Sequence, residues 1–152
     1  MGRSAIMISM LLVGSASGSK LDALADNKFS DKDVIAYREH IMSTLEEQAA
    51  AVGQILSGVI PPDNSTAHFD AIALSAKMAL SAFAPKVPGG QAKANVWSDW
   101  PDFSKRMNEF AQKTALTAKI AREQGNDAAL AGIVEAFTCK SCHDVYRDES
   151  KK

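Results

Sequence analysis

Two cysteines and a histidine near the end of the chain have the types and spacing needed for chemistry. Cys139-Lys140-Ser141-Cys142-His143 has the form C-x-x-C-H, which is the attachment signature of c-type haem. Two thiols at this separation can add to the two vinyl groups on one side of a porphyrin, and the adjacent imidazole can reach the iron. On a helix the positions i, i+3 and i+4 share one face, so Cys139, Cys142 and His143 would act from one turn. The motif therefore predicts one covalently attached haem c, with its iron held by His143.

Two other kinds of site also use a C-x-x-C pair. A thioredoxin-like redox motif follows a strand and begins a helix within a βαβ unit, whereas this pair lies late in a chain with helical spacing. A structural zinc site needs four ligands, usually a second C-x-x-C or a closely spaced histidine pair. The remaining histidines, His40 and His68, lack that spacing. Haem attachment is therefore the favoured interpretation.

The first 25 residues have the pattern of a cleavable secretory signal. Arg3 is the only charged residue before Lys20, and an apolar run over 5–13 is followed by small residues. Cleavage after Ala25, at an A-x-A match, is favoured over cleavage after Ala16. An uncleaved membrane anchor is the alternative, but the run is shorter than the ~20 apolar residues that span a bilayer. We therefore expect export to a periplasm without stable membrane insertion, and this setting suits c-type haem, which is attached outside the cytoplasm.

Length and composition predict a single globular domain over residues 26–152. The whole chain has 152 residues, of which 46% are hydrophobic and 23% charged, values that are typical of one folded domain. The 17 Lys and Arg residues against 18 Asp and Glu residues give a net charge of −1. A nucleic-acid-binding protein would show a basic excess, so that class is excluded.

The helices that must position the motif are predicted from apolar residues spaced three and four apart. The predicted helices cover residues 30–58, 65–84, 98–124 and 127–148, and the Pro- and Gly-rich segment 85–90 is expected to be a loop. No segment shows sustained strand alternation. Long helices with short connections predict an all-α protein, an antiparallel up-down-up-down four-helix bundle.

The chain resembles the class II cytochromes c, a family that includes cytochrome c'. The segment 139–147 is similar to the family's C-K-x-C-H-x-x-Y-R ending. The segment 96–99, with Phe103 and Lys105, is similar to its I-W-x-D-x-x-x-F-x-K pattern. Tyr37-Arg38 followed by Met42 is similar to its first-helix motif. The resemblance spans essentially the whole mature chain and implies a four-helix bundle with its haem near the C-terminus.

Two departures from the family pattern concern the surface and the loops. Glu39 stands where the family usually has Gln, and residues 84–88 replace a common F-P-x-G loop. Neither position coincides with an expected haem ligand.

The resemblance also assigns roles to three residues away from the C-x-x-C-H motif. It places Met42 on the distal side of the haem, where its thioether is expected to be the second axial ligand of a low-spin iron. The alternative is that Met42 only packs above the iron. Arg38 is expected to pair with a haem propionate, and Arg147 is expected to lie beside the His143 imidazole.

These residues predict a periplasmic carrier of single electrons, with His143 and Met42 as axial ligands and other redox proteins as partners. The alternative is a high-spin protein of the cytochrome c' type, with an open sixth site that binds NO or CO. No distal histidine or arginine pair can be assigned, so we do not expect an enzyme. The family also implies a homodimer through the first two helices.

Overall fold

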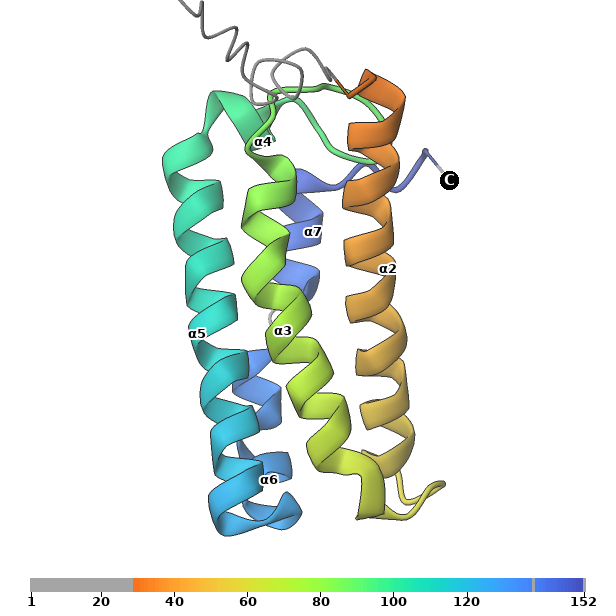
Figure 1. Ribbon diagram of the computed structural model, residues 1–152, viewed down its shortest axis with the longest axis vertical. Coiled ribbons are helices and arrows are strands. Elements are labelled where there is room, and N and C mark those ends of the chain that lie inside the picture. The colour runs from red at the N-terminus through yellow and green to blue at the C-terminus, as the bar shows by residue number, and fades with distance from the viewer. Residues whose placement is uncertain (1–28, 138, 152) are drawn as a thin grey trace, which may run out of the picture.

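The computed structural model describes residues 29–137 and 139–151, and within this part it is helical, with no β-strands beyond isolated bridges. The helices lie side by side (Figure 1). The predicted signal over residues 1–25 lies outside the described residues. No helix of the described part is long and apolar enough to span a membrane.

The first long helix begins and ends where the sequence indicates. α2 covers Asp31–Leu56, and the Ser30 Oγ accepts a hydrogen bond from the backbone N–H of Asp33 at 3.2 Å. Such a cap satisfies one of the free donors at a helix start. Gly58 follows the helix with φ 73°, a conformation that favours glycine.

Short connections join α2 to the next two long helices. The 3₁₀ turn η1, Pro62–Asn64, leads into α3, which covers Ser65–Phe83. A loop and the one-turn helix α4, Asn95–Ser98, lead on to α5, which covers Trp100–Gln124.

The prediction of one continuous fourth helix over 127–148 is wrong. The structure has two helices there, α6 over Asn126–Ala136 and α7 over Cys139–Tyr146. Phe137 adopts φ −85° and ψ 78°, outside the helical region. The chain carries no Gly or Pro at this break. As a consequence, the C-x-x-C-H motif begins a short helix of its own.

The apolar faces of the helices form one core. α2 packs on α3, α3 packs on α5 and α5 packs on α6. In Figure 1, α6 and α7 together occupy the place of a fourth helix. The most deeply buried apolar side chains are Val52, Phe69, Ile72, Ala76, Ala79, Val96, Ala118, Ala129 and Ile133. The four-helix bundle is therefore confirmed, and Ile55 faces the core at the end of α2.

The segment between α3 and α5 lies against α7 and the residues that follow it. The Lys93 N–H donates to the Tyr146 carbonyl at 2.9 Å, and the Asn95 side-chain amide donates to the Val145 carbonyl at 3.0 Å. The same segment approaches α2 closely at Gly90, which has φ 57°, and a Cβ there would lie 2.9 Å from a methyl carbon of Ile35. The segment between α3 and α5 therefore contacts both α7 and α2.

Tyr146 holds α7 against α5. Its side chain is 4% exposed and its ring meets Phe103 edge-on, with ring centroids 5.1 Å apart. The Tyr146 hydroxyl donates to Asp102 Oδ2 at 2.6 Å, and the Arg106 Nε donates to the same oxygen at 2.6 Å. Because α7 has only eight residues, this contact largely determines where the motif lies.

Replacing Tyr146 with Phe is expected to lower Tm by roughly 4 °C, because the ring still packs but the hydrogen bond to Asp102 is lost. Thermal unfolding followed by circular dichroism measures the change. Tyr37→Phe is the control, since Tyr37 is exposed on α2. Equal Tm values for wild type and Tyr146→Phe would show that the hydroxyl contributes nothing to stability.

The same contact predicts a loss of stability at alkaline pH. Burial, together with the bond to Asp102, raises the pKa of Tyr146 from 10.0 to about 12. The folded state thus favours the protonated phenol, so the stabilisation is fully present below pH ~10 and is lost as the pH rises through ~12. The free energy of unfolding of the wild type and of Tyr146→Phe should be measured across this pH range. The wild type should be the more stable at the lower end, and the difference should disappear at the upper end.

Candidate functional site

The C-x-x-C-H motif occupies the first residues of α7. Cys139 is exposed, Cys142 and His143 are partly buried, and neither cysteine is in a disulfide. Because α7 is helical from Cys139 to Tyr146, the three side chains share one face of the helix. The local structure therefore agrees with the spacing argument.

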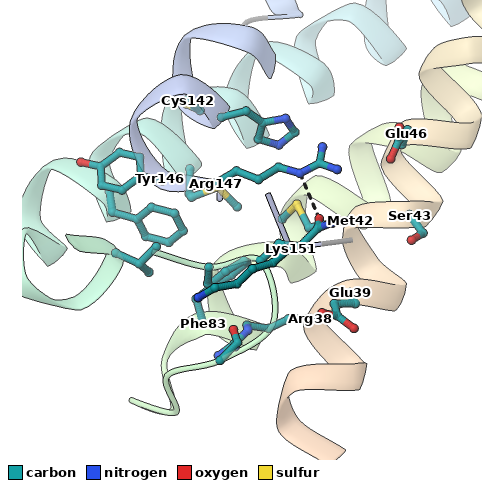
Figure 2. A pocket seen from close by; sticks show the side chains of 17 residues that line it. Arg38, Glu39, Met42, Ser43, Glu46, Phe83, Cys142, Tyr146, Arg147 and Lys151 are labelled. Atoms are coloured by element: carbon teal, nitrogen blue, oxygen red, sulfur yellow. Dashed lines mark hydrogen bonds between the residues drawn. The ribbon is translucent and has the colours of Figure 1, made fainter. Parts of the chain in front are cut away.

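Two adjoining cavities separate this face of α7 from α2. One has a volume of about 360 Å³ and the other about 270 Å³, and together they fall within the ~300–1,000 Å³ typical of ligand sites. The residues that line both cavities are Met42, Glu46, Met107, Cys142, His143 and Arg147. Figure 2 shows the first cavity, with Cys142 and Tyr146 from α7, Arg147 directly after it, and Arg38, Met42 and Glu46 from α2.

The lining of the cavities fits a haem. Cys139 and Cys142 line the second cavity, together with mainly apolar side chains, namely Leu45, Ala49, Ile72, Met107, Phe110 and Phe137. The first cavity has cationic side chains in its wall, Arg38, Arg147 and Lys151. Apolar walls, two thiols, an imidazole and nearby cations match the ring, the vinyl groups, the iron and the carboxylates of a haem.

The electrostatic surroundings favour the neutral imidazole of His143. Burial lowers the pKa of His143, and the nearby Arg147 lowers it further. A neutral imidazole has the free lone pair that an iron ligand needs. Burial also raises the pKa of the partly buried Cys142.

Met42 lies on α2 and lines both cavities together with His143. It is partly buried and packs against the core. The other two histidines do not line either cavity: His40 is exposed, and His68 Nδ1 lies 2.7 Å from Gln48 Oε1. Met42 is thus one of the α2 residues that the structure brings into the cavities with His143.

Arg147 extends from the end of α7 into both cavities. Its Nε donates to Gln91 Oε1 at 3.0 Å, drawn as a dashed line in Figure 2, and also lies 3.6 Å from Glu149 Oε1. The Arg147 backbone N–H donates to the His143 carbonyl at 2.9 Å and so closes the last turn of α7. Arg147 and His143 both line the two cavities.

Arg38 has a role that the sequence did not indicate. Its side chain is 2% exposed and lies between the rings of Phe83 and Trp97, with its guanidinium carbon 5.4 Å and 5.1 Å from their centroids. Its two terminal nitrogens donate to the carbonyls of Val87 and Gly89 at 2.7 and 3.0 Å. Arg38 therefore holds the 85–90 loop on α2, and it also lines the first cavity.

Four residues of the site escaped the sequence interpretation: Gln91, Asp102, Arg106 and Lys151. Asp102 and Arg106 are four residues apart on α5, which is a recognisable ion-pair spacing. The hydrogen bond between Tyr146 and Asp102 joins positions 44 residues apart, and no local sequence pattern predicts such a contact.

The chain is similar to known proteins of one kind. It is 25% identical to a cytochrome c' from Alcaligenes xylosoxydans xylosoxydans, over 76% of this chain and 94% of that protein. It is 27% identical to a cytochrome c' from Halomonas halodenitrificans, over 78% of this chain and 98% of that protein. Its fold matches a nitrosyl complex of a variant cytochrome c prime from Alcaligenes xylosoxidans, with a TM-score of 0.72 and 22% identity. The match covers 79% of this chain and 98% of that chain.

These relatives correct the predicted function. Both carry the name cytochrome c', the high-spin type whose iron keeps an open sixth site for NO or CO. The prediction of a low-spin electron carrier with Met42 and His143 as axial ligands is therefore wrong. A thioether is an adaptable packing group as well as a metal ligand, so the presence of Met42 on the distal side did not distinguish the two types.

The family match covers most of the described structure. A family model described as Cytochrome C' matches residues 33–147, from the first turn of α2 to the end of the C-x-x-C-H-x-x-Y-R segment. Proteins of this family bind one covalently attached haem c with its iron, and the cavities between α2 and α7 fit that group. The chain belongs to the cytochrome c' family.

Proposed function

We propose that this protein binds a small diatomic ligand, NO or CO, at the open sixth position of its haem. The observation that carries the proposal is the match of residues 33–147 to the Cytochrome C' family, together with the cavities between α2 and α7 that His143 lines. The solved nitrosyl complex with a similar fold supports NO as a ligand of this class.

The residues of α7 hold the cofactor. Cys139 and Cys142 would form the two thioether links, and the neutral imidazole of His143 would be the axial ligand from α7. When bound, the haem would supply an iron that can take up a small diatomic molecule. Arg147 lies one turn beyond His143 and lowers its pKa, which helps to keep the imidazole in its ligand form.

The residues of α2 restrict what reaches the open face. Met42 lines the cavities from α2 and packs against the core. The unbranched side chain of methionine is flexible and fills irregular space. Met42 would therefore leave room for a diatomic molecule and exclude larger ones. The protein would thus act as a ligand-binding protein.

Replacing Met42 with Ala tests this role. The change opens the distal wall, so we expect CO association with the reduced protein to accelerate about tenfold, equivalent to a barrier lower by ~1.4 kcal/mol. Flash photolysis of the CO complex measures the rate. Met78→Ala is the control, because Met78 lies on α3 and lines neither cavity.

The ferric spectrum of the same variant discriminates between packing and ligation. With Met42 as a packing residue, Met42→Ala leaves the ferric protein high-spin. A change from low-spin to high-spin on substitution would show that Met42 binds the iron and would refute the open site.

We also propose that the protein is exported to a periplasm after removal of residues 1–25. The apolar run between Arg3 and Lys20 supports export. Mass spectrometry of the haem-loaded protein from a periplasmic extract should show a chain that begins at Asp26. A start at Ser17 would indicate cleavage after Ala16, and a full-length chain in the membrane fraction would contradict export by this route.

A homodimer through α2 and α3 is a further part of the proposal. Both helices expose large apolar or aromatic side chains, Tyr37 on α2 and Leu74 and Met78 on α3. Sedimentation equilibrium of the holoprotein should give a dimer, and Leu74→Glu should shift it towards the monomer while the haem spectrum stays unchanged. A monomer in the wild type at micromolar concentration would refute the dimer.

A further inference from the structure

The chain that follows α7 is directed back across the loop beside the first cavity. The Asp148 N–H donates to the Gln91 carbonyl at 2.8 Å, and Arg147 and Ala92 form an antiparallel bridge. The Lys151 N–H then donates to the Asp148 carbonyl at 3.3 Å. This course brings Lys151 into the wall of the first cavity, where Figure 2 shows it with Arg147 and Arg38.

The three cationic side chains that line this cavity differ in how many of their N–H donors have a hydrogen-bond partner. Arg38 gives two donors to the carbonyls of Val87 and Gly89, and Arg147 gives its Nε to Gln91. Glu39 and Glu46 of α2 are the carboxylates in the same wall. Lys151 differs from the two arginines because no backbone or amide oxygen holds its ammonium group in the described structure.

The one ion pair of Lys151 in the described structure is long. Its Nζ lies 3.4 Å from Asp148 Oδ2, and its side chain is 61% exposed. The other oxygen of Asp148 already accepts hydrogen bonds from the Ser150 N–H and Oγ at 3.1 and 2.6 Å. An ammonium has three donors, so Lys151 can bind a second carboxylate at the cavity mouth.

We infer that Lys151 binds a propionate carboxylate of the haem, so that residues 148–151 form a strap across the mouth of the first cavity. The inference rests on the haem site proposed above and adds a positioning residue to it. The thiols of α7 would hold the vinyl side of the macrocycle, while the strap holds a carboxylate on its other side. The loop at Gln91, which pins Asp148, determines where the ammonium lies.

Three variants of the haem-loaded protein test the inference. Lys151→Met removes the charge at similar length, Lys151→Arg keeps a cation, and Lys105→Met is the matched control on α5, where Lys105 is exposed and faces Glu109. The measurements are the resonance Raman bending mode of the propionates, the haem midpoint potential and hydrogen exchange at residues 148–151.

We expect Lys151→Met to shift the propionate mode, lower the midpoint potential and accelerate exchange in the strap. The potential falls because a cation near the haem disfavours the ferric charge. Lys151→Arg should restore the wild-type values, and Lys105→Met should leave them unchanged. A propionate mode that does not move in Lys151→Met would overturn the inference, even if the potential changes. These readouts need only attached haem, so they stay independent of whether CO or NO binds.

Discussion

The hydrogen bond between Tyr146 and Asp102 is the contact on which the arrangement of the site depends. α7 has eight residues and cannot hold its place by length alone. The buried Tyr146 ring packs on Phe103 of α5 and its hydroxyl is bound at 2.6 Å. With this side of α7 fixed to the bundle, Cys142 and His143 line the cavities between α7 and α2. A helix that packed on α2 directly would leave no room for a macrocycle.

The loop between α3 and α5 joins the two sides of the cavity. Arg38 of α2 binds the carbonyls of Val87 and Gly89, while Lys93 and Asn95 bind the backbone of α7. The loop thus spaces α2 from α7 through hydrogen bonds rather than through apolar packing. These hydrogen bonds give partners to the Arg38 guanidinium, the Lys93 N–H and the Asn95 side-chain amide while the two helices remain apart.

The elements that depend on local pattern could be predicted from the sequence, and those that depend on distant contacts could not. Helical spacing predicted α2, α3 and α5, and Ser30 marked a helix start. The break at Phe137 has no Gly or Pro to announce it, so a single fourth helix was predicted where α6 and α7 lie.

The same division applies to the site. The C-x-x-C-H spacing identified Cys139, Cys142 and His143 because one helical turn is enough to bring them together. The partners of Arg38 are about fifty residues away, so its place under the loop was not foreseen. The type of cytochrome was predicted wrongly because a methionine on the distal side is equally consistent with ligation and with packing.

The electron paramagnetic resonance spectrum of the ferric holoprotein tests the central claim most directly. If α7 alone supplies the protein ligand, through His143, and Met42 only packs on the opposite side, the spectrum is that of a high-spin iron. A low-spin spectrum at neutral pH would show a second strong ligand from the protein. It would contradict the account of an open site between α2 and α7.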